Sequence, residues 1–155
     1  HHNDNKYKKE FKKIINYFGK LKTKSLLLDE LCKYFHINET AKSFYLNKKE
    51  IKYLSSLGMI IGSHTESHTL LSRLNFKQQM KEIKNSKIFL EKTINKKVEY
   101  FCYPYGNKLS YNLDTLKILN KLKFKFGFLA HPKEITNYNY KFKPLELPRF
   151  DCNIF

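Results

Sequence analysis

Residues 59–68 read MIIGSHTESH, and this stretch decides most about the fold and chemistry of the chain. An apolar run at 59–61 passes through a Gly-Ser pair into two histidines four positions apart, His64 and His68. Two imidazoles at this spacing can share one divalent ion. The run is typical of a buried strand, and α/β folds carry their chemistry where strands end. The spacing by itself favours two partly buried polar residues over a metal site. The apolar run and the Gly-Ser pair before the histidines are the features that favour a metal site.

The length and composition indicate a single folded domain. The chain has 155 residues, and its 41% hydrophobic content with 13 Phe and 11 Tyr is enough for a core. No apolar run approaches the roughly 20 residues that cross a bilayer. Residues 1–20 are charged and polar, so no secretory signal is visible. The three cysteines are far apart and form no C-x-x-C pair, which favours a reducing, cytoplasmic location.

The strong positive charge raises nucleic acid as a partner, with 30 basic and 14 acidic residues giving +16. Almost all the basic residues are lysines scattered along the chain, and the only arginines are Arg73 and Arg149. Proteins that read bases rely on Arg for bidentate contacts. We therefore expect no nucleic-acid partner, although a basic nucleic-acid-binding protein stays an alternative motivated by charge alone.

Alternating helical and strand patterns predict an α/β fold with a parallel sheet. Helices are expected over 6–18, 25–36, 48–57, 76–93 and 113–122. Asn47 and Asn75 are the expected N-caps of the third and fourth helices, with Glu50 completing a capping box at the third. Strands are expected over 59–63, 98–102 and 124–130, followed by a short run at 145–150.

A second motif, YPYGN at 103–107, follows the strand expected at 98–102. Taken alone it is an aromatic turn, in which Pro fixes the backbone and Gly permits a tight bend. Its functional interpretation is a rigid turn that aims a backbone N–H at a developing oxyanion and lays an aromatic ring beside a sugar.

Taken together, the segments LGMIIGSHTESHTLLSRL, KEIKNSKIFLE and VEYFCYPYG resemble the polysaccharide deacetylase family, the NodB-homology domain of carbohydrate esterase family 4. The resemblance covers about residues 47–130 in order and spacing. It implies a distorted (β/α) barrel. It also implies metal-assisted hydrolysis of an N-acetyl (or O-acetyl) group on an acetylated sugar or polysaccharide.

In that family two His and one Asp hold a divalent ion, most often zinc, which polarises the acetyl carbonyl and lowers the pKa of a bound water. A second Asp acts as the base, and a backbone N–H steadies the oxyanion. By position, His64 and His68 match the metal ligands. Tyr105 matches the residue whose backbone amide serves the oxyanion.

The resemblance also implies roles for residues around these motifs. Tyr103 and Pro104 would wall the sugar site. Arg149, in LPRFD, resembles the late arginine that orients the catalytic Asp in one branch of the family, a bidentate task for which Arg is suited. In isolation Arg149 is equally an ordinary surface charge. His131 has the local look of the family's general acid but follows YPYG too early, so it is left out of the site.

One family motif has no match. The Asp-Asp motif T-F-D-D-G lies on the first strand of the family, upstream of the two His, whereas Asp4 has no strand before it and Asp29 lies in a helical pattern. We therefore expect residues 3–155 to be one N-terminally incomplete deacetylase-like domain that lacks its first strand. The alternative is a catalytically inactive carbohydrate-binding domain of the same fold. The oligomeric state is not indicated by the sequence.

Overall fold

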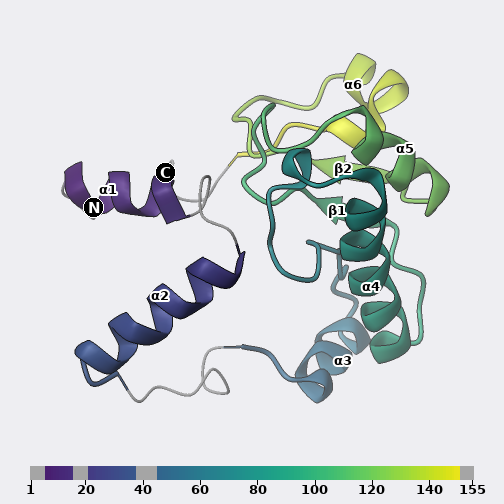
Figure 1. Cartoon of the computed structure of the whole chain (residues 1–155). Coiled ribbons are helices and arrows are strands. Elements are labelled where there is room, and N and C mark those ends of the chain that lie inside the picture. The colour runs from purple at the N-terminus through teal and green to yellow at the C-terminus, as the bar shows by residue number, and fades with distance from the viewer. Residues whose placement is uncertain (1–5, 16–20, 38–44, 151–155) are drawn as a thin grey trace. The chain divides into compact units, whose positions relative to one another are not determined.

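The computed structural model describes residues 6–15, 21–37 and 45–150. The chain divides into two compact units, His1–Leu46 and Asn47–Phe155. The first unit contains helices α1 (Lys6–Lys13) and α2 (Leu21–Tyr34) (Figure 1). The helix expected over 6–18 is confirmed where it is described, and residues 16–18 lie outside that part. In the described part of the chain, no helix is long and apolar enough to cross a membrane. A single domain over 3–155 stays a prediction.

The second unit is built on three capped helices, α3 (Lys48–Ser56), α4 (Phe76–Ile94) and α5 (Leu113–Lys121). Both predicted N-caps are confirmed. The Asn47 side chain accepts hydrogen bonds from two backbone N–H groups of the first turn of α3, and the Glu50 carboxylate accepts the Asn47 N–H at 2.7 Å. The Asn75 side chain accepts the Gln78 N–H at 2.9 Å. Each such cap stabilises its helix by about 1 kcal/mol.

Parallel strands β1 (Tyr100–Cys102) and β2 (Phe126–Phe128) form the sheet, with Phe101 opposite Gly127 (Figure 1). Isolated parallel bridges join Ser63 to Phe101 on one side and Phe128 to Leu147 on the other. Four chain segments therefore run side by side in one direction. The expected α/β class with parallel pairing is confirmed as a partial α/β domain, and closure into a barrel stays a prediction.

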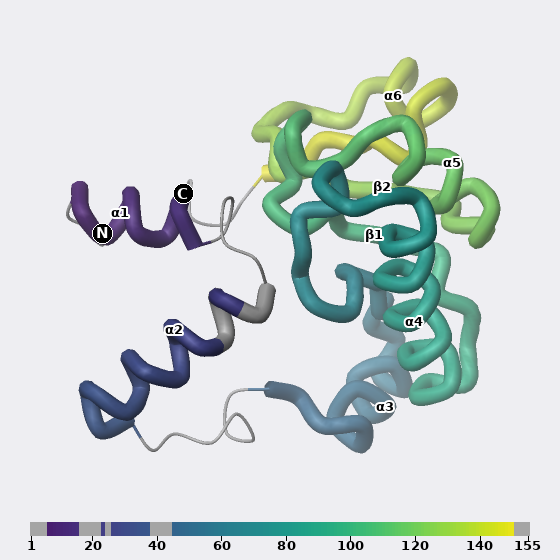
Figure 2. The backbone as a smooth tube through the Cα atoms, viewed as in Figure 1, coloured from purple at the N-terminus to yellow at the C-terminus, as the bar shows by residue number. Residues whose placement is uncertain are grey.

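The strand predicted over 59–63 is wrong, because only Ser63 pairs with β1. Its N–H donates to the Tyr100 carbonyl at 2.8 Å, and its carbonyl accepts the Cys102 N–H at 2.9 Å. In Figure 2 the chain leaves α3, passes beside β1 and turns back into α4. Met59 and Ile60 are 57% and 68% exposed. The apolar run meets no second strand among residues 45–150, so no ladder extends along it.

Helix α4 packs against both α3 and α5, and the buried core joins residues of α4, α5 and β1. Ile83 of α4 is fully buried as predicted, and Met80 and Leu90 pack partly buried beside it. The fully or nearly fully buried cluster also includes Leu71, Val98, Phe101, Tyr103, Ile118, Leu119 and Phe124. Short helices complete the unit: η3 (Leu71–Arg73), α6 (Asn137–Phe142) and η4 (Pro144–Glu146). This core fixes the strand ends from which the site is built.

Candidate functional site

The predicted site residues follow the carboxyl ends of the parallel segments. His64 comes directly after the Ser63 bridge, and the YPYG motif comes directly after β1. Arg149 comes two residues after the bridge at Leu147. Because parallel segments place their carboxyl ends at one edge, these residues gather on the same side of the sheet. Sequence positions spread over more than 80 residues are thereby brought together.

The structure brings the two histidines into contact. The centroids of the His64 and His68 rings are 4.7 Å apart, with the rings nearly perpendicular. His64 Nδ1 lies 2.8 Å from the Cys102 carbonyl oxygen. A carbonyl oxygen can only accept, so Nδ1 carries a proton, and in the neutral ring the lone pair is then on Nε2. This arrangement, in which a second group orients the ring, is the one that metal-binding histidines use.

The histidine loop, which runs from His64 to His68, has an unusual backbone. Thr65 and His68 both have left-handed conformations, with φ values of +67° and +53°. Such residues cost about 1–3 kcal/mol each and persist only where their surroundings hold them. Inside the loop, the Thr65 hydroxyl accepts the His68 N–H at 3.1 Å. This tight turn is what brings the second ring back toward the first.

The YPYG turn lies against the histidines. Tyr105 and Gly106 have φ values of +63° and +61°. The Tyr105 ring contacts the His68 ring, with their centroids 5.0 Å apart. The turn is fixed from the other side by the Ala130 N–H, which donates to the Gly106 carbonyl at 2.9 Å. The backbone of Tyr105 is thereby held beside the histidine pair.

Tyr103 and Pro104 lie beneath the site rather than on its open surface. Tyr103 is 1% exposed, and Pro104 is also fully buried. The Tyr103 hydroxyl donates to the Leu145 carbonyl at 2.6 Å, and burial raises the pKa of Tyr103 above its usual range. The described residues thus do not show the sugar wall expected from these two side chains. They anchor the turn to the segment that leads to Arg149.

Replacing Tyr103 by phenylalanine is expected to lower the free energy of unfolding by about 2 kcal/mol, because the buried Leu145 carbonyl would lose its partner. Urea unfolding monitored by circular dichroism measures this. Tyr138→Phe is the matched control, since Tyr138 is 59% exposed and should change stability little. Equal stability of the Tyr103→Phe variant and the parent would show that the hydroxyl does not anchor the turn.

Arg149 lies close to the end of β1. Burial raises the pKa of the Cys102 thiol, and the positive charge of Arg149 partly offsets that rise. The backbone N–H of Arg149 donates to the backbone carbonyl of His131 at 3.1 Å. Its buried Nε atom has no hydrogen-bond partner among the residues that the structure describes. An orphaned guanidinium N–H near Cys102, at the end of β1, suits a carboxylate partner.

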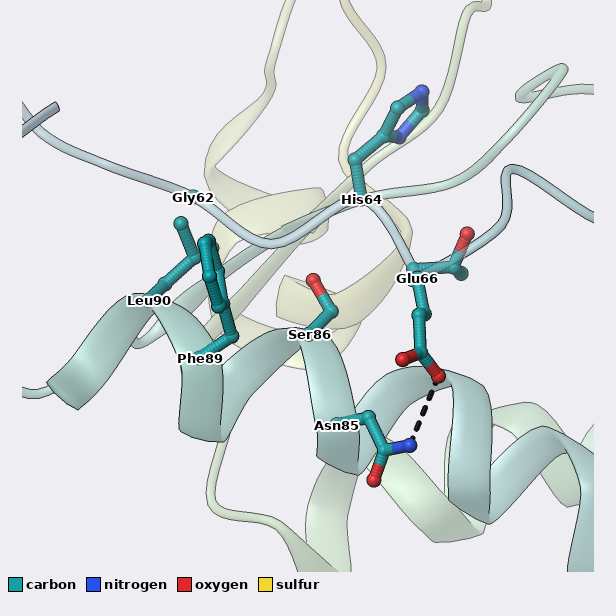
Figure 3. Close-up of a pocket in the computed structure, with 8 residues that line it drawn as sticks. Gly62, His64, Glu66, Asn85, Ser86, Phe89 and Leu90 are labelled. Carbon is teal, nitrogen blue, oxygen red and sulfur yellow. Dashed lines mark hydrogen bonds between the residues drawn. The ribbon is translucent and has the colours of Figure 1, made fainter. Parts of the chain in front are cut away.

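A pocket of about 470 Å³ opens between the histidine loop and α4. In Figure 3 the His64 ring points away from α4, whereas the Glu66 side chain points toward it and accepts a hydrogen bond from the Asn85 amide at 2.9 Å. Ser86, Phe89 and Leu90 form the α4 side of this pocket.

The donor set fits a divalent ion only in part. Two imidazoles with one oriented ring are suitable ligands, but catalytic zinc sites usually take three protein ligands. Within residues 6–15, 21–37 and 45–150, no group of three or more His, Cys, Asp or Glu side chains could hold a metal. A third ligand would have to come from elsewhere.

One residue of the site escapes sequence reasoning. Glu82 of α4 accepts hydrogen bonds from the backbone N–H groups of Glu66 and Ser67, inside the histidine loop. The only signal in the sequence is a carboxylate on a helical face that also carries the core residue Ile83 at the next position, and such a carboxylate is ordinarily a solvated charge.

Comparisons with known proteins agree on one family. The polysaccharide deacetylase family model matches residues 28–127. The Bacillus subtilis (strain 168) protein YxkH, named as a polysaccharide deacetylase, is 30% identical over 88 residues, which are 57% of this chain and 30% of YxkH. The chain thus spans about a third of that relative.

Solved structures give the same result. Streptococcus pyogenes deacetylase PplD, in complex with acetate, matches with a TM-score of 0.61 and 30% identity, over 68% of this chain and 44% of PplD. A polysaccharide deacetylase from Bacillus cereus matches with a TM-score of 0.57 and 25% identity, over 68% of this chain and 32% of that one. With the family model matching well over half of its residues, the chain belongs to the polysaccharide deacetylase family.

Proposed function

We propose that the intact protein is a metal-dependent hydrolase that removes N-acetyl or O-acetyl groups from a carbohydrate. The observation that carries this proposal is the convergence of His64 and His68, 4.7 Å apart between ring centroids, beside the YPYG turn. The family supports a deacetylase, and the acetate in the PplD structure supports acetate as the product. The substrate would be an acetylated sugar or polysaccharide, bound in a domain that closes into a distorted (β/α) barrel.

In this proposal His64 and His68 hold a divalent ion, most often zinc in sites of this kind. When bound, such an ion would supply Lewis acidity to the acetyl carbonyl and lower the pKa of water. His64 offers the lone pair of Nε2 because its Nδ1–H is held by the Cys102 carbonyl at 2.8 Å. The hydrogen bond prevents the ring from turning away, so the ligand is oriented before any ion arrives.

The remaining residues would serve the hydrolysis itself. The Tyr105 backbone N–H is proposed to stabilise the negative charge that develops on the acetyl oxygen, in a turn fixed by Gly106 and Ala130. Arg149 is proposed to hold a catalytic carboxylate through its unpaired Nε–H. Water adds to the acetyl carbonyl, a proton from that water passes to the sugar nitrogen as its bond to the acetyl carbon breaks, and the products are acetate and a sugar with a free amine.

The competing proposal is a catalytically inactive carbohydrate-binding domain of the same fold. The observation that favours it is the lack of a third metal-ligating side chain beside the histidines in the described residues. Two imidazoles alone hold a divalent ion weakly. Metal content after dialysis separates the proposals, because one tightly held ion per chain would count against an inactive domain.

Acetate release from N-acetylglucosamine oligomers tests the enzymatic proposal. The form of the protein to assay is one that also contains the family's Asp-Asp motif, T-F-D-D-G, for which residues 1–155 have no match. This form is expected to release acetate with added zinc, to lose this activity on chelation and to regain it when zinc is restored. If this form releases no acetate with any divalent metal, the proposal is wrong. Acetylated xylan, assayed in parallel, separates ester from amide substrates.

A further inference from the structure

Glu82 of α4 binds the histidine loop with both carboxylate oxygens. Oε2 accepts the backbone N–H groups of Glu66 and Ser67, at 3.2 Å and 2.9 Å. Oε1 accepts the Ser67 hydroxyl at 2.8 Å. We propose that Glu82 is the positioning residue of the histidine pair, holding the loop in the one conformation that lets His64 and His68 face each other. This inference rests on the proposed function, because it concerns the same site.

The loop needs such a support because its conformation is unfavourable by itself. Thr65 is β-branched and has a φ of +67°, a genuine outlier for such a residue. His68 follows with a φ of +53°. Without an outside contact, the chain between these residues would relax toward ordinary backbone angles and separate the two rings. The Glu82 carboxylate binds the two residues in the middle of this segment.

Glu82 is chemically matched to this task. An ionised carboxylate only accepts hydrogen bonds, and the loop presents three donors to it. The Ser67 hydroxyl gives its proton to Glu82 and lies 2.6 Å from the Thr69 hydroxyl, which must therefore donate to Ser67. The support therefore holds two of the three residues between the histidines, Glu66 and Ser67, and reaches Thr69 on the far side of His68.

Glu82 also stands on a rigid base. The next residue, Ile83, is fully buried in the core, and α4 begins at a complete capping box. The hydrogen bonds that Glu82 accepts therefore fix the histidine loop relative to the core. Asn85, one turn further along, contacts the Glu66 side chain but no backbone of the loop in the hydrogen bonds of the structure.

Three variants of the 155-residue chain separate positioning from other effects. Glu82→Ala removes all three hydrogen bonds. Glu82→Gln removes the charge but keeps the shape, since its carbonyl can accept both N–H groups and its amide can donate to the Ser67 oxygen. Asn85→Ala is the matched control, because it removes a bond from the same helix to the same loop. Thermal unfolding confirms that each variant is folded.

The first readout needs no metal. Long-range nitrogen NMR of the histidine rings reports the Nδ1–H form of His64, and ring-to-ring Overhauser effects report its contact with His68. The parent, Glu82→Gln and Asn85→Ala are expected to show both signals. Glu82→Ala is expected to lose the contact and to show mixed ring forms at His64.

The second readout is a Zn²⁺ titration followed by the same ring signals. We expect Glu82→Ala to require about tenfold more Zn²⁺ than the parent, with Glu82→Gln within about twofold of it. A folded Glu82→Ala variant with unchanged rings and Zn²⁺ affinity would overturn the proposal, as would an equal loss in Asn85→Ala. If Zn²⁺ does not change the ring signals of the parent, the metal proposal fails. The NMR signals of the metal-free rings still decide the role of Glu82.

Discussion

Replacing His64 by alanine is expected to lower acetate release about 1000-fold in a form of the protein that carries an Asp-Asp pair, which corresponds to roughly 4 kcal/mol of transition-state stabilisation. The physical reason is the loss of one of the two proposed ring ligands and of the bond that orients it, His64 Nδ1 to the Cys102 carbonyl at 2.8 Å. Initial rates with N-acetylglucosamine oligomers at saturating zinc measure the effect.

His36→Ala is the control for this prediction, because His36 is an exposed histidine in the first unit whose backbone N–H donates to the Lys33 carbonyl. Its acetate release should equal that of the parent. A His64→Ala variant that keeps more than about a tenth of the parent rate, a loss of under 1.4 kcal/mol, would remove His64 from the catalytic site.

Replacing Gly106 by alanine is expected to cost about 3 kcal/mol of the free energy of unfolding, through a clash and a strained backbone together. A Cβ atom at Gly106 would lie 2.4 Å from the Ala130 nitrogen and 2.6 Å from the Ala130 Cβ. The φ of +61° adds the penalty that any L side chain meets there. The turn would have to move, and the Tyr105 backbone with it. Urea unfolding measures the loss.

Gly58→Ala separates the two causes. Gly58 has a φ of +88°, but a Cβ there would meet nothing within 4 Å. Its expected cost is about 1 kcal/mol, from the backbone conformation alone. Equal costs at Gly58 and Gly106 would show that the close approach to Ala130 does not hold the YPYG turn.

Helices α3, α4 and α5 were predictable because their signals are local, whereas α6 was not expected. Asn47 and Asn75 cap α3 and α4 through bonds to residues two or three positions away, so the sequence contains both partners. The two histidines and the YPYG turn were recognisable as motifs for the same reason. The structure adds that they meet, with His68 and Tyr105 in ring contact.

The remaining features depend on distant partners. The run at 59–63 is apolar enough for a strand, but a strand needs a neighbour along its length, and only Ser63 has one. The sequence does not show that the Tyr103 hydroxyl donates to the Leu145 carbonyl, because the two residues are 42 positions apart. Glu82 reads as a solvated helical charge, because nothing in its own segment shows that the histidine loop lies above it.

Anomalous diffraction at the zinc edge, from zinc-loaded crystals of a form of the protein that carries an Asp-Asp pair, tests the central claim most directly. The account predicts one strong peak between the His64 and His68 rings, with a carboxylate oxygen completing the ligand set. A fully occupied zinc site elsewhere, with no peak at the histidine pair, would contradict it.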